Sequence, residues 1–437
     1  NAGMQDFFER EFPSSALLRF GAREWVRDQA NQSNQSNQSN QSNRAENREF
    51  ALDFTTSEGD CIFKRYVSAA SAQELRQAFE KVKKIAAVHI GGLWNVASAR
   101  AKNNGSARVT GRELVFDLDL QDYAFLAVSK DDLPRCDRAF KVIGFGVDLL
   151  RDLLRRAFGF QIFVAVYSGR RGAHLWVLDE RAFRLSDEQR EAIARFFSFN
   201  PSKNATFRLD IYGALHNAAF DGVFERCFEF AYLWLCEADL GFLDSRLSLE
   251  SFVSDLRLAR EPKEGSGSGG SGECDFHTLC LAMCQTKRTA KDRLEAVCRW
   301  CAETASKHHK LEWVFDNFRQ LVVSLVFPRI DAEVSKRCNH LLKCPFSAHA
   351  KTGRVAMPIV GKAEDFEPSR CPTVDGVLAG GAEKRDFDAA VARFERFLGL
   401  MQRLHHGPAA DPCNLFKDDA ASADSADSAD SADSPRI

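Results

Sequence analysis

The sequence predicts an α+β body whose chain is interrupted by an all-helical insertion. Residues 113–120 alternate between apolar and polar side chains, as a half-buried strand does. Two further strand patterns, 161–167 and 174–178, are joined by a short turn that holds two glycines. From residue 186 to about 326 the pattern is mostly helical, and strand-like sequence returns afterwards. Both ends of the chain therefore form the mixed body, and the middle forms the insertion.

Before residue 113 the sequence predicts helices, two strands and a capped helix. These elements cover 6–27, 50–54, 61–67 and 71–84. Pro13 interrupts the first region, because a helix interior cannot accommodate its ring. Ser71 stands where a helix N-cap is expected, and Glu74 follows at the third helical position, which is typical of a capping box.

After residue 120 the expected elements are three helices and three strands. They cover 144–158, 161–167, 174–178, 332–342, 354–359 and 390–404. We therefore expect the mixed body at 1–185 and 327–408, the helical insertion at 186–326, and an acidic, disordered tail at 409–437. Three low-complexity tracts, 31–43, the flexible Gly/Ser linker 265–272 and 421–434, are natural or engineered; the sequence allows either origin.

The overall composition excludes few functions, and the near-zero net charge is the sum of a basic body and an acidic tail. The 437 residues are 45% apolar and 27% charged, which is ordinary for a globular protein with a large core. Basic residues number 59 and acidic residues 61, for a net charge of −2. Residues 411–437 hold seven Asp against Lys417 and Arg436, so the rest of the chain carries +3. A nucleic-acid partner is therefore compatible with the near-zero total.

Thirteen cysteines are dispersed along the chain, without a signal-peptide pattern before them. This favours a reducing compartment with thiols that are free or bound to metal. No apolar run approaches the roughly 18 residues of a membrane span, so we expect no membrane association.

The first motif that carries chemistry is the Asp-x-Asp pair Asp117 and Asp119. Alternate residues of a strand point the same way, so the two carboxylates are expected to project together from an apolar strand. Like charges gather there at a cost unless a cation lies between them, and hard divalent cations prefer such oxygens. The alternative is an edge strand with two solvated Asp.

The second motif is the turn that carries Ser168, Arg170, Arg171 and His174. Arginine offers a planar fork of donors, and glycines let backbone amides approach an anion. This composition suits a triphosphate; the alternative is a solvated basic turn with His174 in the core.

The third group is weaker and contains Asp331, Lys343 and His349. Asp331 would add a carboxylate, and the other two would add phosphate contacts; the alternative is a helix with ordinary polar residues. Together the three groups match two-metal nucleotidyl transfer, in which carboxylates hold two divalent ions and basic groups hold a nucleoside triphosphate.

These segments resemble the catalytic (small) subunit of eukaryotic DNA primase, of the archaeo-eukaryotic primase superfamily. The resemblance rests on 113–123, 167–174 and 327–354, which occur in the order of that family and at similar separations. It extends to 48–50 and 63–66 and covers most of 48–359 outside the insertion.

The resemblance implies the primase fold and synthesis of short RNA primers on single-stranded DNA from ribonucleoside triphosphates. It implies Asp117, Asp119 and Asp331 as catalytic ligands of Mg²⁺ or Mn²⁺. The implied nucleotide-binding residues are Arg65, Ser168, Arg170, Arg171, His174, Lys343 and His349. It also implies a nuclear location and, as partners, a large primase subunit and DNA polymerase alpha.

The sequence departs from the family at the zinc knob that usually follows the Asp-x-Asp strand. Only Cys136 lies there, and one thiolate cannot make a four-ligand site, so we expect no zinc. A second group of cysteine and histidine residues lies within the helical insertion. Free cysteines in such amphipathic helical sequence are more often small buried apolar residues than metal ligands, so we do not expect zinc there either. The group comprises Cys274, His277, Cys280, Cys284, Cys298, Cys301, His308 and His309. His89 replaces a residue that is more often acidic near the sugar site, which leaves sugar recognition open.

Two other functions compete with primer synthesis. A non-catalytic subunit of the same fold would only bind single strands, although it would gain nothing from three carboxylates near phosphate. A repair polymerase of the same fold would prefer deoxyribonucleotides on a primed template. A metal-dependent nuclease of the same fold would cleave a nucleic acid instead of extending it.

Overall fold

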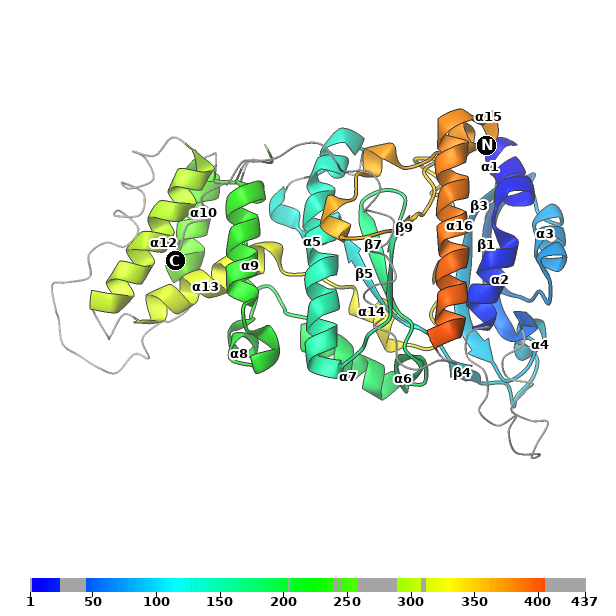
Figure 1. The fold of residues 1–437 in the computed structure, drawn as a ribbon, viewed down its shortest axis with the longest axis horizontal. Helices are drawn as coiled ribbons and strands as arrows, with labels where there is room; N and C mark the ends of the chain where they lie inside the picture. Colours follow the sequence, from blue (N-terminus) through cyan, green and yellow to red (C-terminus); the bar gives the residue numbers. More distant parts are fainter. Residues whose placement is uncertain are drawn as a thin grey trace.

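The computed structural model has two antiparallel sheets, which lie side by side and are covered by helices, and a helical region at one end (Figure 1). It describes residues 2–23, 45–126, 128–129, 131–202, 205–236, 238, 240, 242–243, 246–257, 289–307 and 312–404. The predicted α+β class is therefore confirmed. The linker 265–272 and the tail 409–437 lie outside the described residues.

The first sheet has the strand order β2-β1-β3-β4, and β8 also pairs with β3. Its strands are β1 (Arg48–Thr55), β2 (Cys61–Val67), β3 (Ile85–Trp94), β4 (Val109–Gly111) and β8 (Leu342–Lys343). The helices beside it are α1 (Ala2–Asp6), the π-helix Phe7–Glu11, α2 (Ser14–Ala22) and α3 (Ala72–Glu80). As predicted, Pro13 separates α2 from the preceding turn, and the Ser71 side chain caps α3 by accepting from the Glu74 amide.

The second sheet has the order β5-β7-β6-β9. Its strands are β5 (Leu114–Asp119), β6 (Phe163–Tyr167), β7 (Gly172–Val177) and β9 (Pro358–Ile359). Helix α5 (Leu133–Phe158) lies along this sheet, and α16 (Gly381–Leu404) runs between the second sheet and the N-terminal helices (Figure 1). Short helices α14 (Ala332–Lys336) and α15 (Val374–Ala379) complete the body.

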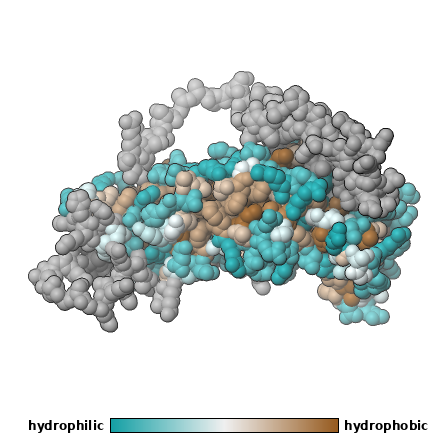
Figure 2. All heavy atoms as spheres, turned by 90° about the horizontal axis from the view of Figure 1, so that it is seen from below, coloured by the Kyte–Doolittle hydropathy of each residue, from teal (hydrophilic) through white to brown (hydrophobic). Residues whose placement is uncertain are grey.

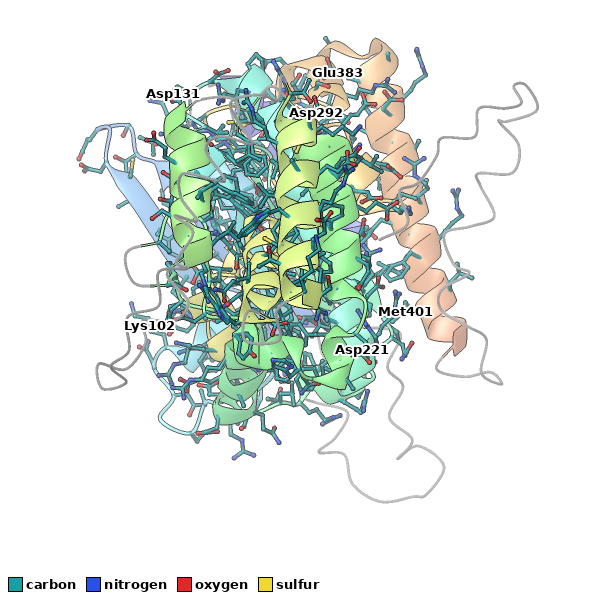
Figure 3. All side chains as sticks on the ribbon, turned by 90° about the vertical axis from the view of Figure 1, so that its left-hand side faces the viewer. Lys102, Asp131, Asp221, Asp292, Glu383 and Met401 are labelled. Atoms are coloured by element: carbon teal, nitrogen blue, oxygen red, sulfur yellow. The ribbon has the colours of Figure 1, made fainter. Side chains whose placement is uncertain are left out.

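The helical end is formed by residues from the middle of the chain. Its helices include α9 (Val223–Phe230), α10 (Arg246–Arg257), α12 (Ala290–Lys307) and α13 (Glu312–Val326). Helix α7 (Asp187–Phe197), which begins the predicted insertion, packs instead against α14 of the body (Figure 1). Figure 3 looks onto this end and shows side chains packed between the helices, with Asp292 on α12 and Asp221 just before α9. Of the described helices, none has the length and apolar character to cross a bilayer. The exact boundaries of the insertion remain a prediction.

A buried ion network fastens the two sheets to each other. Glu113, just before β5, accepts from Arg48 of β1 and from Arg23 at the end of α2, and all three side chains are buried. Burial alone would raise the pKa of Glu113, but Arg48 and Arg23 hold it at about 2. Arg48 also donates to the carbonyls of Gly21 and Gly91. The start of β5 is thereby fixed relative to the first sheet, and so is the Asp-x-Asp pair that follows.

The extents of several expected elements differ from the structure. The closing helix expected at 390–404 begins at Gly381. The helix expected at 332–342 ends at Lys336, because the chain then turns to pair with β3 as β8. The helix expected from residue 144 begins at Leu133, where the Asp132 side chain accepts from the Arg135 amide. The strand expected at 354–359 is only two residues long. Strands β3 and β4 were not expected at all.

Candidate active site

Strand β5 presents Asp117 and Asp119 on the face opposite Leu114, Phe116 and Leu118, beyond the buried Val115 on their own face. Leu114, Phe116 and Leu118 are fully buried, and Gly146 of α5 lies close to Leu118. The side chain of Asp117 is 27% exposed. The alternation predicted from the sequence therefore turns both carboxylates toward the same partly open side of the sheet.

Asp331 joins this pair from the other edge of β5. Ile330 forms a β-bridge with Leu118, and the Asp331 amide donates to the Asp117 carbonyl at 2.9 Å. Since β7 occupies the opposite edge of β5, Asp117 lies between β7 and Asp331. The structure thus brings together the three carboxylates predicted from well-separated parts of the chain.

The carboxylates disturb one another electrostatically. Burial, together with Asp119, Asp331 and Asp122, raises the pKa of Asp117 to about 7. Burial and the same neighbours, Asp119 and Asp331, raise the pKa of Asp122 as well. Asp122 was not predicted, although its place three residues after Asp119 was a usable signal. A divalent cation would relieve this repulsion, and carboxylate oxygens are the donors that Mg²⁺ and Mn²⁺ prefer.

Two of the carboxylates are engaged elsewhere in this structure. Asp119 pairs with Arg171 at 3.2 Å, and Asp331 caps α14 by accepting from the Glu333 amide at 2.9 Å. Within the described ranges, no three His, Cys, Asp or Glu side chains already surround a metal position. The donor set suits a divalent ion: the cap of α14 uses only Oδ1 of Asp331, while Asp119 would share its carboxylate between the ion and Arg171 or release Arg171.

The turn between β6 and β7 is closed by its own hydrogen bonds and by a neighbouring loop. The Ser168 amide donates to the Gly172 carbonyl, and the Gly172 amide donates to the Ser168 hydroxyl. Gly169 has a φ of +91°, and a Cβ there would lie 2.7 Å from Cβ of His349. Thr352 donates to the Gly169 carbonyl at 2.7 Å. Glycine is therefore required at this position by both conformation and space.

The two arginines of the turn reach toward acidic groups near β5. Arg171 contacts Asp119, and Arg170 pairs with Asp131, whose side chain is 76% exposed. The Arg170 and Arg171 side chains are only 12% and 16% exposed, so an incoming phosphate would have to replace a carboxylate that each guanidinium already holds. Arg171 thus lies at the carboxylate cluster, whereas Arg170 extends from the same turn to Asp131.

Lys343, His174 and His349 complete the predicted phosphate-binding group. Lys343 donates to the Ser168 carbonyl at 3.3 Å, and burial lowers its pKa to about 8. Burial and the charge of Lys343 lower the pKa values of His174 and His349 to about 3, so both imidazoles are neutral. Nε2 of His174 lies 3.7 Å from Asp117, while its buried Nδ1 has no hydrogen-bond partner. An unpaired buried polar atom beside carboxylates and Lys343 is the kind of group that a ligand satisfies.

Arg65 lies apart from this turn, on the Asp331 side of the site. Its guanidinium donates two hydrogen bonds to Glu49 and one to the carbonyl of Asn339. Burial lowers the pKa of His340. The charge of Asp331 opposes this shift and the charge of Arg65 adds to it, which indicates that His340 lies near Asp331 and near Arg65. A contact of Arg65 with phosphate remains a prediction.

Two further residues border Lys343. His89 pairs with Lys343 through β3 and β8, its buried Nε2 has no hydrogen-bond partner, and the Phe63 ring lies 5.0 Å away. Burial raises the pKa of Asp53 against the opposing charge of Lys343. Asp53 was not predicted, because a single acidic residue in a strand is common. Since Asp53 and His89 both adjoin Lys343, both are candidates for contact with the sugar of a nucleotide.

The cysteines predicted not to bind zinc can be located only in part. Cys136 is buried in α5, where its thiol contacts the Ser129 carbonyl. Cys298 and Cys301 are buried in α12. The remaining members of the second group lie outside the described residues. They are Cys274, His277, Cys280, Cys284, His308 and His309.

The comparisons with known proteins agree with the order of these motifs. The family model of the DNA primase small subunit matches residues 116–360. A DNA primase small subunit of Caenorhabditis elegans is 30% identical over 66% of this chain and 70% of its own length. That of Saccharomyces cerevisiae is 27% identical over 82% of both chains. The small subunit PriS of the archaeon Thermococcus onnurineus is 30% identical over 35% of this chain and 42% of its own length. The chain belongs to the DNA primase small subunit family.

Proposed function

We propose that this chain is the catalytic subunit of a primase and joins ribonucleotides into a short RNA primer on single-stranded DNA. The observation that carries the proposal is the cluster of Asp117, Asp119 and Asp331 directly beside the β6–β7 turn and Lys343. Membership of the family supports the same function.

We further propose that Asp117, Asp119 and Asp331 hold two Mg²⁺ or Mn²⁺ ions. Bound ions of this kind lower the pKa of an attacking 3′-hydroxyl and neutralise charge on the triphosphate. The protein contributes position: the β-bridge at Leu118 fixes Asp331 beside Asp117, and the closed turn fixes Ser168.

The basic groups would orient the triphosphate. Arg171 would exchange Asp119 for a phosphate oxygen, which also frees that carboxylate for a cation. Lys343 and the neutral His174 lie where they can donate to the same phosphates, since both adjoin Asp117 and the turn. A cation bound by Asp119 would free Arg171, and a phosphate bound by Arg171 would free Asp119. Each ligand therefore breaks the ion pair that the other would otherwise have to break, so we expect metal and nucleotide to bind cooperatively.

The predicted partners and location belong to the same proposal. We expect a large primase subunit and DNA polymerase alpha to accompany the chain in a nuclear primosome. The template would be single-stranded DNA and the substrates ribonucleoside triphosphates.

Incubation of the full chain with poly(dT), ATP and Mn²⁺ or Mg²⁺ tests the function. The expected product is oligoriboadenylate. Asp117→Asn should reduce its formation at least 100-fold, as expected when a charged group that acts on the transition state is removed. Asp152→Asn is the matched control, because this carboxylate lies on α5 and pairs with Arg155 and Arg226 away from the site.

The alternatives give different results in the same assay. Salt-dependent binding of the DNA without any incorporation would indicate a non-catalytic subunit. Faster use of dATP than ATP on a primed template would indicate a repair polymerase. Full activity of Asp117→Asn would contradict the proposal that this carboxylate holds a catalytic metal ion.

A further inference from the structure

Phe63 of β2 is a large apolar residue that stays half exposed beside the candidate active site. It is 49% exposed. Apolar side chains are visible over much of the face in Figure 2, and single exposed ones are ordinary on a protein surface. Phe63 stands out by its position, because its ring lies 5.0 Å from the imidazole of His89, and His89 pairs with Lys343.

The pairing of the strands places these side chains on one face of the first sheet. Phe63 lies opposite Asp53 of β1. Two residues earlier on β1, Ala51 lies opposite His89 of β3, which in turn lies opposite Lys343 of β8. Residues that lie opposite each other, and residues two apart along a strand, point to the same face. All five side chains therefore share one face, and the effect of Lys343 on the pKa of Asp53 agrees with this.

Ala51 allows the Phe63 ring to reach across the strand that separates it from His89. β2 and β3 are two strand spacings apart, or about 10 Å, because β1 lies between them. Ala51 of β1 is fully buried and its side chain ends at Cβ, so the two rings can meet above it, at an angle of 76°. His89 thus supports the ring, while about half of Phe63 stays open to solvent. A ring held in this way is preorganised for a flat ligand.

The side chains on this face follow the order of the parts of a nucleotide. Lys343 donates to the Ser168 carbonyl, where the triphosphate is proposed to bind. His89 comes next, and its buried Nε2 has no hydrogen-bond partner. Burial and the charge of Lys343 lower the pKa of His89 to about 4, so its imidazole is neutral and suits a sugar hydroxyl. Phe63 follows on the side away from Lys343, because β1 and β8 lie on opposite edges of β3.

We propose that Phe63 is the surface on which the base of the incoming ribonucleoside triphosphate stacks. This inference rests on the proposed function, because it takes the triphosphate to lie at Lys343 and the β6–β7 turn. An aromatic ring recognises the face of a base, which all four bases have, and leaves the hydrogen-bonding edge free. A template-directed enzyme needs both properties, since the template selects the base through that edge.

The incoming base has a free face at this stage of the reaction. Before the new bond forms, one face of the base meets the last base of the growing strand, and the other face has no neighbour. Phe63 would cover this second face. When a primer is started there is no growing strand, so the contact with Phe63 would matter most for the first nucleotides.

Titration of the full chain in Mn²⁺ without DNA tests the stacking site. The two probes are ATP and ribose 5-triphosphate, which has the same sugar and phosphates but no base. Phe63→Ala is expected to raise the Kd for ATP about tenfold, in the lower part of the range for a base on an aromatic ring. The Kd for ribose 5-triphosphate is expected to stay within twofold, which also shows that the phosphate site of the variant is intact.

Two further variants separate the ring from its surroundings. Phe63→Tyr keeps the ring and is expected to leave the Kd for ATP within twofold. Ile62→Ala is the matched control. Ile62 is 39% exposed on the same strand, but it lies opposite Phe54 and so points to the other face of the sheet. This control is expected to leave the Kd for both probes unchanged.

Three results would overturn the proposal. An unchanged Kd for ATP in Phe63→Ala would show that the ring holds no base. An equal rise for ATP and ribose 5-triphosphate would show that the ring only supports the sugar and phosphate contacts. A rise for ATP that appears only after addition of poly(dT) would assign the ring to the template strand.

The outcomes also separate the stacking site from the proposed function. If the expected shifts occur but the unaltered chain makes no RNA, the proposed function fails and the stacking site stands. If ATP and ribose 5-triphosphate bind the unaltered chain with the same Kd, the base adds no affinity and the stacking site fails, whether or not RNA is made.

Discussion

Asp117→Asn is expected to stabilise the metal-free protein at alkaline pH although it removes a proposed catalytic group. Burial, Asp119 and Asp331 raise the pKa of Asp117 from 3.8 to about 7, whereas the unfolded chain ionises the same carboxyl near 3.8. The folded protein therefore keeps a proton that the unfolded chain loses. Its stability falls as the pH rises through this window, and the full cost is reached above the folded pKa. Asparagine carries no charge and avoids that cost.

The magnitude follows from the size of the pKa shift. About three pKa units correspond to about 4 kcal/mol at 1.36 kcal/mol per unit. The Asp117 side chain is 27% exposed, so solvent screens part of the repulsion, and we expect about 2 kcal/mol. In a chain of 437 residues, such a change raises Tm by about 2–3 °C.

Thermal unfolding in EDTA at pH 8 and pH 5 provides the assay. The gain of Asp117→Asn over the unaltered chain should be largest at pH 8 and shrink at pH 5, where the native carboxyl is protonated. Asp152→Asn should show no gain at either pH, because its carboxylate lies in exposed ion pairs. A loss of stability at pH 8 in Asp117→Asn, or an equal gain at both pH values, would refute the electrostatic reasoning.

Three further predictions concern the support of the phosphate-binding group. Arg354→Ala should lower the free energy of unfolding by about 3–5 kcal/mol, because Arg354 and Asp137 form a largely buried ion pair; urea unfolding checks this, and a loss below 1 kcal/mol would contradict it. Gly169→Ala should raise the Kd for ATP several-fold, since its Cβ would displace His349; an unchanged Kd in a titration with Mn²⁺ would contradict it. The affinity for ATP should fall as the pH rises through about 8, where Lys343 loses its proton. Lys343→Arg should remove that dependence, and an identical pH profile in the variant would assign the titration to another group.

Local signals were sufficient for the parts of the site that depend on one segment. Alternation predicted β5 and the direction of Asp117 and Asp119, and the two glycines predicted the β6–β7 turn. The capping pattern at Ser71 predicted the start of α3. Each of these features is determined by neighbours within a few residues, so the sequence alone contains it.

The remaining features depend on contacts between distant segments. β3 was not predicted, because Gly91 and Gly92 weaken a strand pattern; the structure requires them, since Cβ atoms there would meet Leu341 and the Cys338 carbonyl at 2.7 Å. β8 forms only by pairing with β3 and therefore replaces part of an expected helix. The earlier start of α5 did have a local signal, because Pro134 in the first turn follows a capping Asp132.

The site itself was predicted residue by residue but not in its present arrangement. No local pattern indicates that Asp119 contacts Arg171 or that Asp331 caps α14. Asp53 and Asp122 join the site through packing and through proximity to other charges, which the order of residues does not reveal.

The central claim is that the three carboxylates hold the metals beside a triphosphate on the β6–β7 turn. Crystals of the full chain with Mn²⁺ and a non-hydrolysable ATP analogue test it directly through anomalous scattering. We expect manganese density bounded by Asp117, Asp119 and Asp331, with the triphosphate against Arg171 and the side chain of Arg171 released from Asp119. Manganese density elsewhere, or a triphosphate bound away from this turn, would contradict the claim.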